Sequence, residues 1–135
     1  MKTTLTPYLM LNGKASEIMK FYQQCIGGQL EMMTFSQMQG EACPVAIRDL
    51  VMHASLKSGD FVLMASDGNP DMPAVTGSNV QLAINAPDPE LDGFFNALAN
   101  GGKIVHALFN APWGGRFGVL TDRYGIHWMF ASSPR

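Results

Sequence analysis

The sequence predicts an α+β protein that consists of two tandem βαβββ modules. The main observation is an internal repeat: residues 12–30 and residues 87–104 each run from a turn, through an apolar-striped helix, to a Gly-Gly pair. Each copy follows one short apolar segment and precedes several more, and these segments have the length and composition of strands. The length of 135 residues suits one compact domain with a sizeable core. We therefore expect a single domain divided into module one, linker and module two at about residues 1–66, 67–78 and 79–135.

The first module begins with a predicted strand at residues 5–11, followed by a helix at Ala15–Ile26. Apolar residues recur on one face of this helix at helical spacing, namely Ala15, Ile18, Tyr22, Cys25 and Ile26. Gly27 and Gly28 then supply the left-handed conformation that commonly ends a helix. The remaining pattern predicts strands at residues 29–35, 51–56 and 61–65, a loop at 36–50, and a hairpin turn at 57–60.

The second module repeats this order. Its first strand is expected at residues 79–85, where apolar and other residues alternate. A helix follows with Asp88 as its N-cap and Pro89 at its first position. Its apolar stripe has i, i+3, i+4, i+7 spacing and consists of Leu91, Phe94, Phe95 and Leu98. The three later strands are expected at residues 103–109, 117–121 and 126–131.

The composition indicates a globular protein, with 47% hydrophobic and 15% charged residues and a net charge of −2. The slightly acidic balance predicts no attraction to nucleic acid or anionic membranes, and no segment approaches the length of a membrane span. Cys25 and Cys43 are the only cysteines, and they are expected as reduced thiols in a cytoplasmic protein. Cys25 is expected to be buried in its helix, and Cys43 to be more exposed in the loop before Pro44. The low charge would let a second copy of the chain cover an apolar face, so we expect a homodimer.

The duplicated βαβββ pattern resembles the vicinal oxygen chelate superfamily of glyoxalases, bleomycin resistance proteins and extradiol dioxygenases, and most closely its PhnB-like branch. The resemblance covers essentially the whole chain and is strongest in the closing segment 121–128, TDRYGIHW. Other matching residues are Thr6-Pro7-Tyr8-Leu9, Asn12-Gly13, Phe21-Tyr22, Met52-His53-Ala54, Ser66-Asp67, Trp113-Gly114 and Gly118. This resemblance implies a glyoxalase-like fold, in which curled mixed sheets enclose a ligand-binding cup.

Metal-dependent members of the superfamily place ligands on the first and last strands of each module. Alignment of the two halves puts Tyr8 opposite Gln81, and Leu63 opposite Met129, near those positions. Only Gln81 offers a suitable donor for a hard metal ion, and a single neutral amide does not hold one. We therefore expect no metal and no cofactor.

The histidines leave alternatives open. Alternation places His53 and Ser55 on one face of their predicted strand. His53 is either a polar contact or general base in the cup, or a hydrogen-bonded strand histidine. His127 either lines the cup or lies at the surface near a turn, and His106 is expected at an edge or in solvent.

The segment 110–117 combines aromatic and basic residues around two glycines. Trp113 could form an aromatic wall and Arg116 could bind an anion, because its guanidinium offers paired donors. Alternatively, Trp113 closes the core and Arg116 is solvated.

Members of the PhnB-like branch often carry a 3-demethylubiquinone methyltransferase label. Adenosylmethionine-dependent methyltransferases typically have a Gly-rich turn after a parallel strand, and this sequence has none, so we do not expect that activity.

We interpret the chain as a cytoplasmic, PhnB-like small-molecule-binding protein without a metal. The expected cup lining consists of Tyr8, His53, Leu63, Gln81, Trp113, Arg116, His127 and Met129. The alternative is a metal-dependent lyase, isomerase or transferase that acts on a small oxygen-rich or phosphonate-like substrate, with Gln81 and a histidine as ligands. A third possibility is a pure interaction module. The sequence leaves open whether the modules pair within one chain or across a dimer, and whether residues 36–50 act as a lid.

Overall fold

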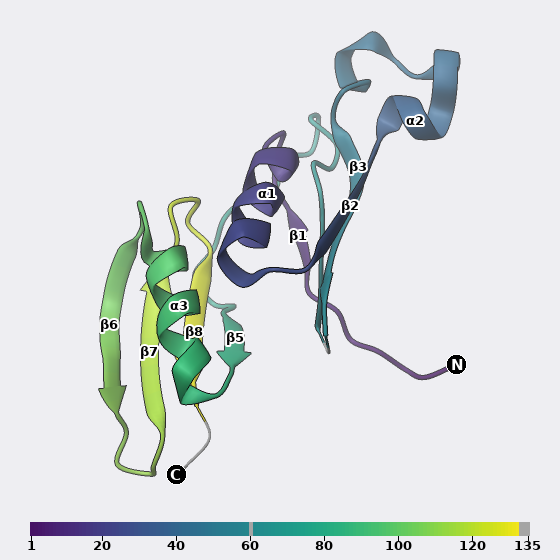
Figure 1. Cartoon of the computed structure of the whole chain (residues 1–135). Helices are drawn as coiled ribbons and strands as arrows, with labels where there is room; N and C mark the ends of the chain where they lie inside the picture. Colours follow the sequence, from purple (N-terminus) through teal and green to yellow (C-terminus); the bar gives the residue numbers. More distant parts are fainter. Residues whose placement is uncertain (60, 133–135) are drawn as a thin grey trace. The chain divides into compact units, whose positions relative to one another are not determined.

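The computed structural model describes residues 1–59 and 61–132, and it divides into two compact units, Met1–Val75 and Thr76–Arg135. Asp60, part of the predicted hairpin turn, lies outside the described residues. Each unit contains a four-stranded mixed sheet with one long helix against one face (Figure 1). The α+β class and the duplicated βαβββ order predicted from the sequence are therefore confirmed.

Unit 1 has the strand order β1-β4-β3-β2, in which β1 is parallel to β4 and the other pairs are antiparallel. Its main elements are β1 (Tyr8–Met10), α1 (Ala15–Ile26), β2 (Gln29–Thr34), β3 (Val51–Ser58) and β4 (Phe61–Ser66).

Unit 2 has the equivalent order β5-β8-β7-β6, again with one parallel pair, β5 with β8. Its elements are β5 (Leu82–Asn85), α3 (Asp88–Ala99), β6 (Lys103–Asn110), β7 (Arg116–Thr121) and β8 (His127–Ala131). The two first strands, β1 and β5, are shorter than the sequence predicted. No helix in the described ranges is long and apolar enough to cross a membrane.

The core of each unit lies between its helix and its sheet. In unit 1 the fully buried Met19 and Tyr22 of α1 lie on the same side of the sheet as Leu56. In unit 2 the fully buried Leu91 and Leu98 of α3 lie on the same side of the sheet as Leu120. All five residues of the predicted α1 stripe are buried, namely Ala15, Ile18, Tyr22, Cys25 and Ile26. Helical periodicity therefore identified the packed face correctly.

The Gly-Gly pair of each repeat has two separate roles. The first glycine, Gly27 or Gly101, has a positive φ of 77° or 78° at the end of the helix. The second, Gly28 or Gly102, passes so close to the facing strand that a Cβ atom would collide with the carbonyl oxygen of Lys57 or Thr121. Only the first role was predicted from the sequence, because the second depends on a distant strand.

A polar side chain after the last strand secures the beginning of the third strand in both units. In unit 1 the buried Asp67 accepts hydrogen bonds from the backbone N–H of Val51 at 2.7 Å and of Ala15, at the start of α1, at 2.8 Å. In unit 2 the hydroxyl of Ser132 accepts the backbone N–H of Arg116 at 2.7 Å. The carboxylate thus also fixes the helix, which the serine does not.

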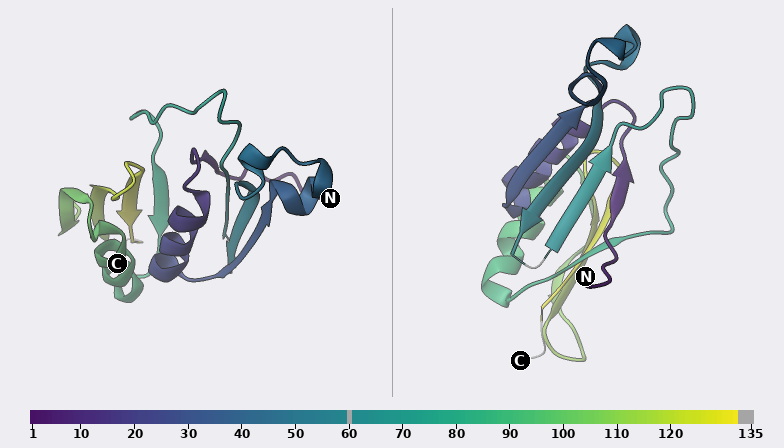
Figure 2. Two further views of the ribbon diagram at one scale, coloured as in Figure 1. Left: turned by 90° about the horizontal axis from the view of Figure 1, so that it is seen from above. Right: turned by 90° about the vertical axis from the view of Figure 1, so that its right-hand side faces the viewer.

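Residues 36–50 do not form the plain loop that was predicted. They contain most of α2 (Phe35–Gln39) and two 3-10 turns, η1 (Gly40–Ala42) and η2 (Val45–Ile47), which extend beyond the ends of β2 and β3 (Figure 2). The helix begins with a capping box, because the Thr34 hydroxyl accepts the N–H of Gln37 and the Gln37 side chain accepts the N–H of Thr34. The Thr-x-x-Gln spacing is a recognisable signal for such a start.

Two smaller predictions were also wrong. Pro87, not Asp88, occupies the N-cap of α3, because the helix begins one residue earlier than predicted. Cys43, expected in an exposed loop, is buried, and its thiol donates to the carbonyl of Pro44 at 3.5 Å.

Candidate ligand-binding surface

The face of the unit 1 sheet opposite α1 carries polar side chains, and we call it open face 1. Its central row crosses all four strands, because Tyr8 pairs with Met64, Met64 with Ser55, and Ser55 with Glu31. Period-2 alternation places these side chains away from the buried Ala54 and Leu56. Tyr8 is 46% exposed and Glu31 is also exposed, so the ends of the row are accessible.

Tyr8 and His53 form a polar pair on open face 1. The Tyr8 hydroxyl shares a hydrogen bond of 2.9 Å with His53 Nδ1, and the two ring centroids are 5.6 Å apart. His53 thus makes a side-chain hydrogen bond, which is compatible with both roles considered for it. This bond leaves Nε2 as the ring nitrogen that faces other partners, as donor or acceptor according to the tautomer.

Ser55, in the middle of the row, has a buried hydroxyl with no hydrogen-bond partner among the described residues. The residue is only 6% exposed. Ser66, on the same face of the neighbouring strand, is equally buried but satisfied: its hydroxyl donates to the carbonyl of Val51 and accepts the N–H of Gly68. An unpaired buried hydroxyl is costly, so it calls for an explanation.

The corresponding face of unit 2, open face 2, is apolar at three of the four equivalent positions. Its central row consists of Ala83, Met129, Val119 and His106, which pair across β5, β8, β7 and β6. His106 lies on the edge strand and is exposed, as predicted. The two units thus present unlike chemistry on equivalent surfaces.

An aromatic cluster extends open face 2. Phe117 lies between Phe109 and Trp113, with centroid distances of 6.0 Å and 6.1 Å and edge-to-face geometry in both pairs. Trp113 is 65% exposed and therefore does not close the core. Of the two roles considered for Trp113, the structure is compatible with the aromatic wall.

Both ring nitrogens of His127 are engaged. Nδ1 lies 2.9 Å from the Thr121 hydroxyl, and Nε2 lies 3.2 Å from the carbonyl oxygen of Gly77, to which it donates. Gln81 precedes β5 and is exposed. The structure therefore holds His127 in a local hydrogen-bond network instead of offering it as a free base.

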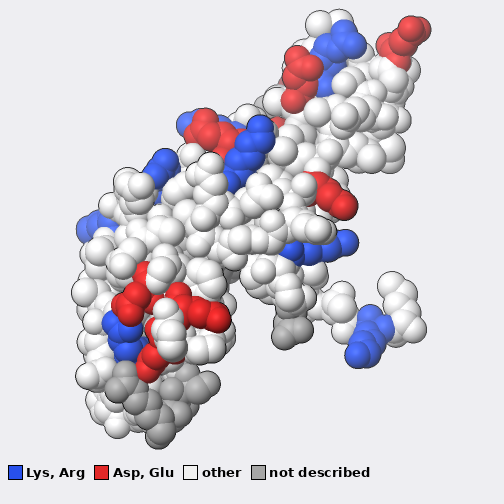
Figure 3. Space-filling model, in the orientation of Figure 1, with Lys and Arg blue, Asp and Glu red and all other residues white. Residues whose placement is uncertain are grey.

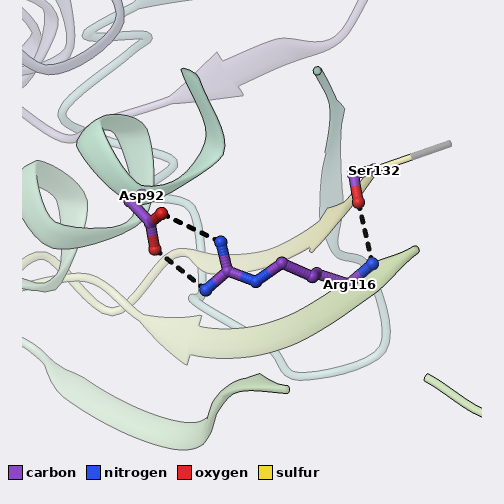
Figure 4. A network of polar contacts seen from close by, with 3 residues as sticks. All are labelled: Asp92, Arg116 and Ser132. Carbon is purple, nitrogen blue, oxygen red and sulfur yellow. Dashed lines mark hydrogen bonds and ion pairs between the residues drawn. The ribbon is translucent and has the colours of Figure 1, made fainter. Parts of the chain in front are cut away.

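Two predicted lining residues are placed away from the open faces. Leu63 is 4% exposed and pairs with Leu56, so it belongs to the core beneath α1. Arg116 belongs to the helix side of unit 2, where its guanidinium donates to both carboxylate oxygens of Asp92 at 2.9 Å (Figure 4). Two of its five N–H donors are thus already paired with an anion of the same unit.

This ion pair changes the titration of both groups. The hydrogen bond from Arg116 lowers the pKa of the Asp92 carboxyl, and the same bond raises the pKa of Arg116. Acidic side chains gather over α3 on the face drawn in Figure 3, whereas elsewhere on that face acidic and basic side chains are interspersed.

The pairing registers correct the internal alignment made from the sequence. Tyr8 is equivalent to Ala83, not to Gln81, because Tyr8 lies seven residues before α1 whereas Ala83 lies five before α3. Met129 is equivalent to Met64 instead of Leu63, because Met129 follows its cross-strand partner Val119 by ten residues, whereas Met64 follows its partner Ser55 by nine.

The corrected positions do not fit a hard metal ion. The first and last strands present Tyr8 with Met64 in unit 1 and Ala83 with Met129 in unit 2, and neither a thioether nor a methyl group is a suitable ligand. Within residues 1–59 and 61–132, no three His, Cys, Asp or Glu side chains gather as a metal site would require.

Sequence reasoning missed Ser55 and Met64 as members of this surface. The alternation that placed His53 and Ser55 on one face was correct, but no local signal shows that a serine hydroxyl lacks a partner. That property depends on which side chains three other strands bring to it.

A family model described as 3-demethylubiquinone-9 3-methyltransferase matches residues 3–131. The protein YjdN of Escherichia coli K12 is 31% identical over 93% of this chain and 92% of its own length. The solved structure of protein PA1353 from Pseudomonas aeruginosa is 36% identical, with a TM-score of 0.86 and 98% coverage of both chains. That of a putative 3-demethylubiquinone-9 3-methyltransferase, PhnB protein, from Bacillus cereus is 26% identical, with a TM-score of 0.73 and coverage of 97% and 100%.

Further structures share the fold at lower identity. Several glyoxalase-related and glyoxalase/bleomycin resistance/dioxygenase proteins superpose with TM-scores of 0.58 to 0.63 at 13% to 20% identity. The two βαβββ units are thus the architecture of the glyoxalase-like fold.

Proposed function

The chain belongs to the 3-demethylubiquinone-9 3-methyltransferase family, in the PhnB-like branch of the vicinal oxygen chelate superfamily, and on this premise we propose that it is a metal-free small-molecule-binding protein. The ligand would contact the open faces of its sheets. The proposal does not include methyl transfer, because the sequence lacks the Gly-rich turn that such enzymes typically use.

The observation that carries this proposal is the unpaired, buried Ser55 hydroxyl beside the Tyr8–His53 pair. A sheet face that only completed a core would be apolar, and its polar groups would be satisfied. Polar groups of this kind among adaptable methionine side chains, such as Met64, are typical of a ligand site.

The metal-dependent alternative is not favoured. It required Gln81 together with His53 or His127 as ligands. Both nitrogens of His127 have partners, and Nδ1 of His53 is occupied by Tyr8. A thermal-shift series with chelator-stripped protein and Ni²⁺, Mn²⁺, Fe²⁺ or Zn²⁺ should therefore be flat. A shift of several degrees with one ion would restore the enzyme hypothesis.

We further propose a cytoplasmic homodimer. Support comes from the exposed apolar side chains of β6, including Ile104 and Val105, on a chain with few charges. Light scattering coupled to size-exclusion chromatography should give about twice the mass of the chain. A monomer at micromolar concentration would refute the dimer and leave ligand binding untouched.

The test of ligand binding is a fragment screen by two-dimensional ¹⁵N NMR. Ligands should shift the amide signals of residues on the open faces, such as His53 and Ser55. The amide signals of α1 and α3, which cover the other face of each sheet, should shift less. If no fragment perturbs either open face, the chain does not bind small molecules in this way.

A further inference from the structure

We propose that the Ser55 hydroxyl anchors an uncharged ligand that bears a carbonyl or hydroxyl group. This inference rests on the proposed function and specifies the ligand class for open face 1. Its starting point is the contrast between two buried serines of one sheet face, of which Ser66 is hydrogen-bonded and Ser55 is not.

The Ser55 side chain faces the ligand side of the sheet. Its strand neighbours Ala54 and Leu56 are fully buried on the helix side, so alternation directs Ser55 to open face 1. The cross-strand partners Met64 and Glu31 lie on the same face. A buried hydroxyl without a hydrogen-bond partner costs free energy. A donor or acceptor group of a ligand would therefore form a hydrogen bond with Ser55 without displacing an existing protein partner.

Access to the hydroxyl depends on Met64. This half-buried residue lies directly opposite Ser55, and its unbranched side chain has three rotatable bonds. A rotamer change of Met64 would expose the Ser55 hydroxyl on open face 1. The thioether would then contact the apolar part of the ligand.

The charges around Ser55 favour a neutral ligand. Glu31 lies opposite Ser55, and Lys57 lies two residues along β3 on the same face, so the flanking charges have opposite signs. Two further polar groups of open face 1, Tyr8 and His53, bond one another. A ligand charge would have to be desolvated against Met64 without a dedicated counter-charge, which is costly.

The experiment compares three probes of one shape: acetophenone, ethylbenzene and benzoate, titrated by ¹⁵N NMR into the full chain. Acetophenone should perturb the amides of open face 1 most strongly. Ser55→Ala should weaken acetophenone binding by about tenfold, the value of one hydrogen bond, and leave ethylbenzene unchanged. Ser66→Ala is the matched control and should not alter the affinity for acetophenone.

Ser55→Cys provides a second variant, because a thiol is a weak hydrogen-bonding group of similar shape. The affinity of this variant for acetophenone should fall between that of the wild type and that of Ser55→Ala. If acetophenone and ethylbenzene bind equally and Ser55→Ala changes neither, the anchor is wrong while the proposed function stands. Benzoate binding as tightly as acetophenone would refute the uncharged class. If none of the probes perturbs open face 1 while other fragments do, the inference also fails, whereas silence from every fragment removes the proposed function itself.

Discussion

Asp122 Oδ2 accepts a hydrogen bond of 2.9 Å from the indole N–H of Trp128, and both residues are buried. The other carboxylate oxygen, Oδ1, accepts the backbone N–H groups of Tyr124 at 2.8 Å and Ile126 at 3.1 Å. A single carboxylate therefore closes the turn between β7 and β8 and satisfies the largest side chain of the unit 2 core.

Asp122→Ala should destabilise the protein by about 3 kcal/mol, because it removes the acceptor of one buried indole N–H and of two partly buried backbone N–H groups. Asp122→Asn keeps an oxygen for the turn but presents an amide to Trp128, so its loss should be smaller, about 1–2 kcal/mol. Urea denaturation measures both. Equal losses for the two variants would show that the turn bonds contribute nothing measurable.

The fold was predictable from the sequence where signals are local. The apolar stripe of α1, the glycines after both helices and the alternation in β3 and β5 gave the element order. The start of α2 was also encoded, in Thr34 and Gln37, and was overlooked. The starts of β1 and β5 were placed too early, because apolar composition does not show where a partner strand begins to pair.

The candidate site was less predictable, since it depends on registers between strands. Leu63 and Met64 differ by one position, yet one is in the core and the other on open face 1. Side chains alternate between the two faces along β4, so an error of one residue selects the wrong face. The alignment of the two halves made this error because Met129 lies one residue further from its partner Val119 than Met64 lies from Ser55. Likewise, no sequence feature indicated that Arg116 would be paired with Asp92 of α3.

Ser55→Ala should stabilise the ligand-free protein by about 1 kcal/mol, because it removes a buried hydroxyl that has no partner. Ser66→Ala should destabilise it by about 1 kcal/mol, because that hydroxyl is hydrogen-bonded. The opposite signs should be visible as shifts of a few degrees in thermal melts. A loss of stability in Ser55→Ala would mean that its hydroxyl has a partner in solution.

Two glycines of unit 2 should respond in opposite ways to alanine. Gly93 lies inside α3 with open space at its Cβ position, so Gly93→Ala should stabilise by about 0.5–1 kcal/mol. Gly102→Ala should destabilise by about 2–3 kcal/mol, because its methyl group would collide with backbone atoms of Thr121 and Asp122. Chemical denaturation of the two variants side by side tests the close approach directly.

Asp92→Asn should lower the melting temperature slightly at neutral pH, because the pair with Arg116 is exposed and partly screened. The Arg116 hydrogen bond lowers the Asp92 pKa in the folded state, so the contribution is present above the ordinary carboxyl pKa and is lost as pH falls through the folded value. Melts between about pH 7 and pH 3 should therefore converge for wild type and variant. A constant difference down to the lowest pH would contradict this account.

The two tryptophans should be separable by fluorescence. Trp113 is 65% exposed and Trp128 is 3% exposed. Trp113→Phe should leave a blue-shifted emission that acrylamide quenches weakly, because only the buried indole remains. Strong quenching in this variant would show that the unit 2 core opens readily.

The unlike central rows of the two open faces have a consequence for how this chain could evolve. Parts that fold each unit recur in both halves, as with Gly28 and Gly102, whereas the equivalent positions Ser55 and Val119 carry a hydroxyl in one half and a branched alkyl group in the other. Substitutions on an open face therefore change what the surface can recognise without altering the close contacts beneath it. A change of side chain at Ser55 or Val119 would therefore alter the open face of one unit and leave the glycine contacts of both units in place.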